Sequence, residues 1–205
     1  MSVRVKICGL TNRADAFAAV DHGADAVGFV LFEHSKRFIP ADDAVRIARE
    51  LPPYVQRVAV SVNMPPAQLR AIDASRAFDV WQLHGSESRG DCAALRPRRL
   101  IKAFGLPLLA GVEPGDYDAD AFLLDKLSAE FGGTGAAFDW TLARQFQIKT
   151  DRPCILSGGL NADNVRAALD AVRPYAVDVC SGVEESYGRK DLGKLQRFIE
   201  LCKTY

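Results

Sequence analysis

Residues 3–32 read VRVKICGLTNRADAFAAVDHGADAVGFVLF and contain one complete unit of the expected fold. Val3–Cys8 and Ala26–Phe32 are short runs rich in Val, Ile and Phe, which favour buried strands. Between them, Asn12–His22 has an amphipathic helical pattern, with Asn12 as N-cap and an aspartate three residues on. The stretch therefore predicts a strand, a helix and a second, parallel strand.

The same alternation continues along the rest of the chain. Six further strands and four further helices are expected from hydrophobic periodicity. The strands are Arg57–Val62, Val80–His84, Leu100–Phe104, Ala121–Asp125, Pro153–Ser157 and Ala176–Cys180, and the helices are Pro40–Leu51, Pro65–Ala74, Asn161–Val172 and Leu192–Lys203. One unit is defective, because Pro107, Gly111, Pro114 and Gly115 interrupt residues 105–118. Only a loop or a single turn is expected there.

Eight parallel strands separated by helices predict an α/β fold, a single (β/α)8 TIM barrel over residues 1–205 with a degenerate helix after strand five. About 200 residues is the lower end of the size range of this fold. An open, doubly wound sheet is the alternative. In a barrel the reactive groups lie where strands end, so the residue that closes each apolar run is a candidate.

Composition limits the possible partners. Lys plus Arg and Asp plus Glu both number 26, so no net field attracts nucleic acid or an acidic membrane. Five scattered cysteines without a C-x-x-C pair favour reduced thiols and a cytoplasmic location, and argue against structural zinc. We expect neither a signal peptide nor a membrane span, and the sequence leaves monomer and homodimer open.

Two strand ends carry candidate acid–base groups. Alternation along a strand puts Lys6 and Cys8 on one face, about 6 to 7 Å apart along the strand. An ammonium at this distance lowers the pKa of a thiol, so Cys8 could accept a proton near neutral pH. The same alternation turns Asp125 inward at the end of an apolar strand, where burial would keep it partly protonated as a general acid requires. The alternatives are a small buried hydrophobe for Cys8, and a helix cap or a partner of Lys126 for Asp125.

Glycines follow the last two strands. Gly158 and Gly159 come after strand seven, and Ser181 and Gly182 after strand eight, so that backbone N–H groups could hold a phosphate. Simple turns are the alternative. Residues 132–135, Gly-Gly-Thr-Gly, follow strand six and are expected either to cover the substrate or to form a plain turn.

Three further side chains are candidates for substrate contacts. Arg37 lies in the loop after strand two, where its guanidinium could grip a carboxylate, although a solvated basic loop is equally consistent. Gln82 and His84 share the inward face of strand four. His84 is either a substrate hydrogen-bond donor or a satisfied core histidine.

Taken together, these motifs resemble the phosphoribosylanthranilate isomerase family. The match runs over nearly the whole chain, and its specificity comes from the order of modest motifs after successive strands. The matching segments are residues 6–11, 28–30, 37, 82–85, 102–104, 124–125, 132–135, 156–160 and 178–184.

The resemblance implies a cofactor-free and metal-free isomerase of tryptophan biosynthesis. Its reaction is the Amadori rearrangement of N-(5-phosphoribosyl)anthranilate to 1-(2-carboxyphenylamino)-1-deoxyribulose 5-phosphate, with Asp125 as general acid and Cys8 as general base. The implied substrate-binding residues are Arg37, Gln82, His84, Gly158, Gly159, Asp178, Ser181 and Gly182, with Arg37 on the anthranilate carboxylate and the glycine loops on the phosphate.

Two positions depart from the pattern of the family. Lys36 stands where proline is usual, so the Arg37 loop loses rigidity, and Cys180 stands where serine is common. One rival is the histidine-pathway aldose–ketose isomerase, which would need a carboxylate in place of Cys8. Another is a non-catalytic phosphometabolite-binding protein, which the pairing of Cys8 with Asp125 disfavours.

Overall fold

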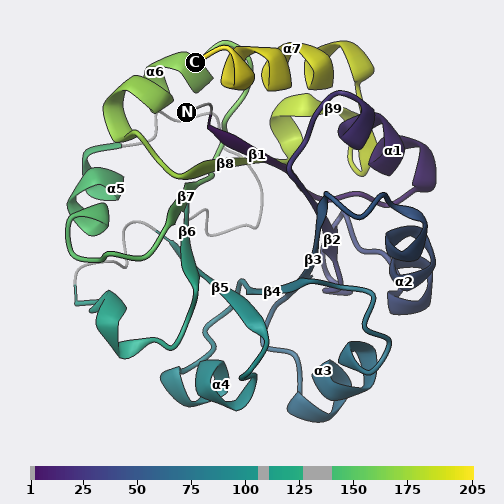
Figure 1. Cartoon of the computed structure of the whole chain (residues 1–205), viewed down its shortest axis with the longest axis vertical. Coiled ribbons are helices and arrows are strands. Elements are labelled where there is room, and N and C mark those ends of the chain that lie inside the picture. Colours follow the sequence, from purple (N-terminus) through teal and green to yellow (C-terminus); the bar gives the residue numbers. More distant parts are fainter. Residues whose placement is uncertain (1–2, 106–110, 127–139) are drawn as a thin grey trace.

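The computed structural model describes residues 3–105, 111–126 and 140–205. Within these ranges, eight parallel strands pair in chain order and form a closed barrel, because β1 pairs with both β2 and β8 (Figure 1). The strands are β1 (Arg4–Ile7), β2 (Ala26–Val30), β3 (Gln56–Ser61), β4 (Val80–Leu83), β5 (Arg99–Gly105), β6 (Ala121–Asp125), β7 (Cys154–Leu156) and β8 (Ala176–Val179). The predicted barrel is confirmed, and the open-sheet alternative is wrong.

Helices surround the barrel on its outside (Figure 1). They are α1 (Arg13–Asp21), α2 (Ala41–Glu50), α3 (Pro66–Asp73), α4 (Arg89–Ala94), α5 (Trp140–Gln147), α6 (Val165–Val172) and α7 (Leu192–Lys203). The predicted cap of α1 is present, because Asn12 Oδ1 accepts the Asp15 N–H at 2.9 Å. Helix α6 begins later than predicted, because the Asn161 side chain closes a turn on the N–H groups of Asp163 and Asn164.

The unit after β5 departs from the repeat as predicted. Its only described helical segment is one 3₁₀ turn, η2 (Pro114–Asp116). Proline at the first position of this turn fixes the backbone angle that starts it but cannot extend a helix. Residues 106–110 of this unit, with the predicted break at Pro107, lie outside the described residues.

A small hairpin after β8 was not predicted. A 3₁₀ turn, η3 (Ser181–Val183), leads into β9 (Glu184–Ser186), which pairs antiparallel with β10 (Arg189–Lys190). Thr11, after β1, donates its hydroxyl to Gly188 O at 2.6 Å. The hairpin is thus attached to the carboxyl end of the barrel between the first and last units.

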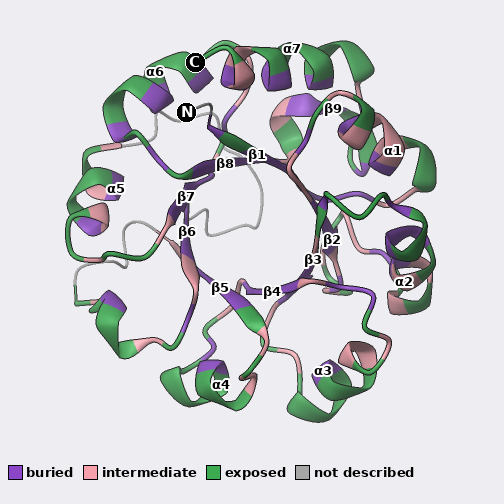
Figure 2. Ribbon diagram, viewed as in Figure 1, coloured by how far each residue is buried: buried purple, intermediate pink, exposed green. Residues whose placement is uncertain are grey.

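Alternating strand residues divide the core into two layers. Most of the barrel strands are buried, whereas the surrounding helices carry many exposed residues (Figure 2). Ile7, Phe122 and Leu124 belong to the layer between strands and helices, whereas Cys8 and Leu123 belong to the layer inside the barrel. This confirms the predicted facing of β1 and β6. Within the described ranges no helix has the length and apolarity needed to cross a bilayer.

Candidate active site

The two predicted acid–base residues share one end of the barrel. Cys8 directly follows β1, and Asp125 is the last residue of β6. In a parallel barrel all strands point the same way, so both residues belong to the carboxyl-terminal mouth, where barrel enzymes carry their reactive groups. Each has a different set of neighbours.

A buried ion pair supports the Cys8 side of the mouth. Lys6 Nζ donates to Asp178 Oδ1 at 2.8 Å, and both side chains are about 5% exposed or less. The register of β1 on β8 places these two residues directly opposite each other. Ser157 Oγ, at the end of β7, donates to the other Asp178 oxygen at 3.4 Å. Asp178, predicted to bind substrate, is thus fully engaged inside the protein.

The net pKa shift of Cys8 is opposite to the prediction. Burial raises the pKa of this thiol more than the Lys6 ammonium lowers it, and the Asp178 carboxylate raises it further. Burial lowers the pKa of Lys6, but attraction to Asp178 and Cys8 outweighs it, so Lys6 stays positive. The prediction considered the ammonium and omitted the loss of water around the thiol.

Gly28, in the middle of β2, leaves the space that these side chains occupy. A β-carbon at this position would lie 2.9 Å from Cys8 Sγ and 3.2 Å from Lys6 Nζ. Both distances are shorter than ordinary van der Waals contact. Residue 28 therefore has to be glycine for the thiol and the ammonium to keep these positions.

A hydrogen-bonded chain supports the Asp125 side. Gln82 Nε2 lies 2.8 Å from His84 Nδ1, and His84 Nε2 lies 3.1 Å from Asp125 Oδ2. The other Asp125 oxygen accepts the backbone N–H of Lys126 at 2.7 Å. With the amide oriented in this way, neutral His84 donates to Asp125. Gln82, predicted to touch substrate, is fully buried behind His84, whereas His84 and Asp125 are each 28% exposed.

The two predicted phosphate loops meet. Gly158 and Gly159 both have a positive φ, 87° and 74°. Residues that carry a side chain adopt such angles only under strain. Gly182 packs so closely on the same loop that a β-carbon there would overlap Leu160 O. Ser181 is exposed beside it, at the start of η3. The geometry brings these two loops together. Residues 132–135, predicted to cover the substrate or to form a plain turn, lie outside the described residues.

Arg37 is already paired with a carboxylate of its own chain. Its Nε and Nη2 donate to Glu184, with the shortest bond 2.7 Å between Nη2 and Oε2. Lys190 Nζ, which is fully buried, lies 3.0 Å from Glu184 Oε1 and also donates to the carbonyls of Cys8 and Cys180. The alternative of a solvated basic loop is wrong for Arg37, whose side chain is 12% exposed.

Side-chain contacts restrain the loop around Lys36, where the family usually has proline. Ser35 Oγ accepts the Arg37 N–H at 3.1 Å and closes a short turn. The Tyr187 ring, on the β9–β10 hairpin, lies 4.4 Å from Lys36 Nζ and 5.1 Å from the Arg37 guanidinium carbon. The Arg37 loop is therefore held from both sides by side chains.

Sequence reasoning missed Glu184 and Lys190 as site residues. Glu184 is the last residue of the family segment 178–184 and carries no pattern of its own, and Lys190 lies in a two-residue strand without periodicity. Their separation of six residues with a glycine between them was the available signal for a hairpin. Burial of both charges became apparent only from the fold.

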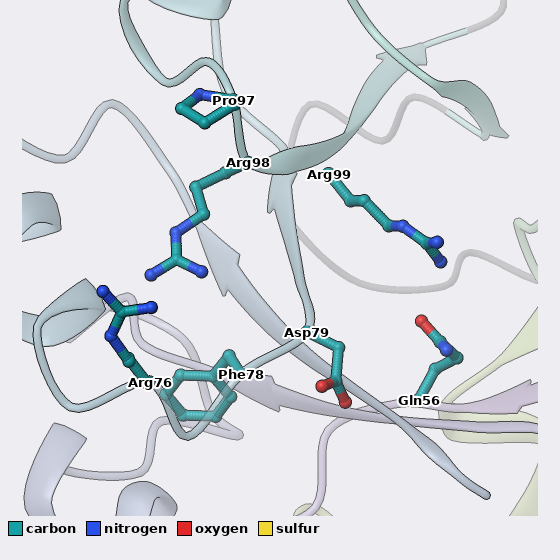
Figure 3. Close-up of a pocket in the computed structure, with 7 residues that line it drawn as sticks. All are labelled: Gln56, Arg76, Phe78, Asp79, Pro97, Arg98 and Arg99. Carbon is teal, nitrogen blue, oxygen red and sulfur yellow. The ribbon is translucent and has the colours of Figure 1, made fainter.

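A separate hollow of about 330 Å³ lies on the opposite, amino-terminal face (Figure 3). None of the predicted site residues lines it. Its lining residues precede or begin β3, β4 and β5, and are Gln56, Arg76, Phe78, Asp79, Pro97, Arg98 and Arg99. Across the described parts of the chain, no three His, Cys, Asp or Glu side chains gather to hold a metal ion.

A closed (β/α)8 barrel with polar side chains at its carboxyl-terminal mouth is the architecture in which barrel enzymes carry their active sites. The family model of N-(5'phosphoribosyl)anthranilate (PRA) isomerase matches residues 5–201. The Geobacter metallireducens N-(5'-phosphoribosyl)anthranilate isomerase is 47% identical, covering 98% of this chain and 100% of that protein. The chain belongs to the phosphoribosylanthranilate isomerase family, which confirms the predicted resemblance and an isomerase of tryptophan biosynthesis.

Solved structures agree with this family. The phosphoribosylanthranilate isomerase of Thermotoga maritima is 43% identical with a TM-score of 0.90, over 99% of this chain and 100% of that one. A structure in complex with reduced 1-(o-carboxyphenylamino)-1-deoxyribulose 5-phosphate is 40% identical with a TM-score of 0.83, with the same coverage. The Thermotoga maritima enzyme, described as dimeric, has also been solved as monomers; that structure is 39% identical with a TM-score of 0.84, over 99% of this chain and 100% of that one.

Proposed function

We propose that this chain catalyses the Amadori rearrangement of N-(5-phosphoribosyl)anthranilate with Cys8 as general base and Asp125 as general acid. One observation carries the proposal: a thiol and a carboxyl group end two different strands at one barrel mouth. The thiol lies beside a buried ammonium, and the carboxyl group accepts a hydrogen bond from a histidine. The reaction needs one proton acceptor and one proton donor around a small sugar.

The proposed steps balance without a cofactor. Asp125 gives a proton to the ribose ring oxygen while the C1–O bond breaks, and the nitrogen lone pair forms an iminium at C1. Cys8, as thiolate, takes the proton from C2, so that the C–H electrons become the C1=C2 bond of an enolamine and the C1=N π electrons return to nitrogen. Tautomerisation moves the enol proton to C1 and gives the ketone at C2, and transfer of the proton from Cys8 to Asp125 through solvent restores both groups. Lys6 supports this step, since its positive charge favours the thiolate.

Binding would use both sides of the mouth. The backbone N–H groups near Gly158, Gly159, Ser181 and Gly182 would hold the phosphate, supported by the contact between these loops. Arg37 would bind the anthranilate carboxylate. Asp178 and Gln82 face internal partners, Lys6 and His84, and would hold those groups in place.

The test is an anthranilate-fluorescence assay on freshly generated substrate. We expect turnover by the unaltered chain, and a loss of about 10³-fold or more in kcat for both Cys8→Ala and Asp125→Asn, with unchanged folding. The histidine-pathway aminoaldose serves as the second substrate and should not react. Full activity of either variant would remove that residue from the mechanism.

We further infer that the chain forms a homodimer through its amino-terminal face. The dimeric Thermotoga maritima relative supports self-association. Tyr54 is 100% exposed on the loop between α2 and β3, two residues before Gln56, which lines the hollow of Figure 3. Light scattering should show a dimer that Tyr54→Ser dissociates, whereas Tyr187→Ser, at the opposite mouth, leaves it intact. A monomeric unaltered chain would contradict the inference.

We also propose a cytoplasmic location without nucleic-acid partners. All five cysteines are free. Acidic and basic residues are equal in number, so the chain offers no net charge to a polyanion. Fractionation of the native host and a nucleic-acid binding assay at low salt test the two statements.

A further inference from the structure

Glu184 is a buried carboxylate that the isomerase chemistry above does not use. It begins β9, its side chain is 5% exposed, and it contacts two cations, Arg37 and Lys190. Burying a carboxylate is costly unless charge and hydrogen bonds compensate for the lost water. Here burial raises the pKa of Glu184, but the Arg37 hydrogen bonds and the Lys190 charge lower it by more. Glu184 is therefore ionised at neutral pH.

Glu184 occupies one edge of the guanidinium of Arg37. A guanidinium presents five N–H donors in one plane, and Glu184 accepts from Nε and Nη2. Among the described residues no partner of Nη1 is found. The edge formed by Nη1 and the second Nη2 hydrogen matches a further carboxylate in two parallel hydrogen bonds.

The cluster of Arg37, Glu184 and Lys190 has two positive charges and one negative charge. Lys190 Nζ contacts Glu184 Oε1, which also accepts from Arg37 Nε, and it donates to the carbonyls of Cys8 and Cys180 at 2.7 and 3.2 Å. The thiol of Cys180 adds no charge, because burial raises its pKa to about 12. One net positive charge remains in the cluster, and it favours a further anion at the edge of Arg37 that Glu184 leaves open.

We propose that Glu184 is a positioning residue: it fixes the Arg37 guanidinium so that the open edge binds the carboxylate of the substrate, which makes the site selective for aryl amines that carry an ortho-carboxylate. This proposal rests on the proposed function, in which Arg37 meets that carboxylate. Glu184 itself touches no reacting atom. Lys190 is its counter-charge and joins this binding group to the backbone of Cys8.

The experiment compares Glu184→Gln with the unaltered chain on two substrates. One is N-(5-phosphoribosyl)anthranilate, and the other is the phosphoribosyl adduct of aniline, which lacks the carboxylate. Glutamine keeps the shape but weakens the hold on Arg37, so we expect KM for the first substrate to rise about tenfold with little change in kcat. KM for the aniline adduct should stay the same.

Two further variants separate positioning from folding. Glu185→Gln is the matched control, because Glu185 is half-exposed and pairs only with Arg189 at 3.1 Å among the described residues; its KM should not change. Glu184→Gln combined with Lys190→Met removes one charge of each sign, so the cluster keeps its net charge of plus one. The combined variant should show the same substrate-dependent rise in KM, even where the single variant folds poorly.

A double-mutant cycle makes the test stricter. In an Arg37→Ala background, Glu184→Gln should have no further effect on KM for the anthranilate substrate. An unchanged or lower KM in Glu184→Gln, or an equal rise for both substrates, would overturn the proposal. If instead the unaltered chain fails to turn over the anthranilate substrate, the proposed function fails and the positioning role fails with it.

Discussion

The two sides of the barrel mouth hold their proposed catalytic groups in different ways. Around Cys8, the charges of Lys6 and Asp178 are almost completely buried and depend on each other. Around Asp125, the side chains of His84 and Asp125 are each 28% exposed. Water can therefore replace a hydrogen bond that either of them loses on mutation. On the proposed mechanism, the thiol of Cys8 depends on the charge of a buried ammonium to act as a base, whereas the carboxyl group of Asp125 depends mainly on its orientation.

The largest expected effect concerns stability. Asp178→Asn leaves Lys6 as a buried ammonium without its carboxylate, and we expect a loss of about 3–5 kcal/mol in the free energy of unfolding. Asp125→Asn, on the more exposed side, should cost about 1 kcal/mol or less. Denaturant unfolding followed by circular dichroism measures both. Equal losses would mean that the two sides do not differ in this way.

The second prediction concerns pH. Burial raises the pKa of Cys8 above its ordinary value of 9.0, and only the thiolate can accept the C2 proton. As a result, kcat/KM should rise between pH 7 and 9 by about tenfold per unit. In Lys6→Met the thiolate loses its nearest cation, so the rise should move to higher pH. A flat profile in the unaltered chain would contradict this assignment.

The third prediction tests orientation on the Asp125 side. His84→Ala removes the hydrogen bond to Asp125 Oδ2, and we expect kcat to fall about tenfold without a change in the pH at which activity rises. Gln82→Met, one step further along the chain of hydrogen bonds, should have a smaller effect in the same direction. A larger effect of Gln82→Met than of His84→Ala would break the proposed order of contacts.

The smallest expected effect is the acid sensitivity that comes from Glu184. Its pKa is lowered in the folded chain, so its stabilisation is present above the unfolded pKa of about 4.5 and is lost as pH falls through the lower folded value. Glu184→Gln should therefore flatten the decrease of stability below pH 4.5. Unfolding midpoints between pH 3 and 6 provide the measurement, with Glu185→Gln as the reference.

The facing of strand-end residues could be predicted because a strand has a period of two. That rule put Cys8 and Asp125 on the inner face, and the structure places Cys8 and Leu123, which shares the face of Asp125, in the layer inside the barrel. The pairing of Lys6 with Asp178 could not be read in the same way, since 172 residues separate them and only the closure of β1 on β8 sets them opposite each other. Local patterns contain no information on the register of this closure.

Burial was the second quantity that the sequence could not supply. Lys6 beside Cys8 predicts a lowered thiol pKa, yet the removal of water reverses the net direction. The Glu184–Lys190 hairpin went unpredicted for a related reason: its strands of three and two residues are too short to show a pattern. Glu184 and Lys190, the charged residues on these two strands, are recognised as a buried pair only when the fold around them is known.

Gly28 has a consequence for how this site can change. A mid-strand position usually tolerates small or β-branched residues, but here even a methyl group would displace the sulfur or the ammonium. Any exchange of the Cys8 thiol for a carboxylate, which the histidine-pathway isomerase would need at this position, has to fit the same confined volume next to Gly28. Which catalytic side chain can replace Cys8 is therefore limited first by the volume available next to Gly28 and only then by the reactivity of the new group.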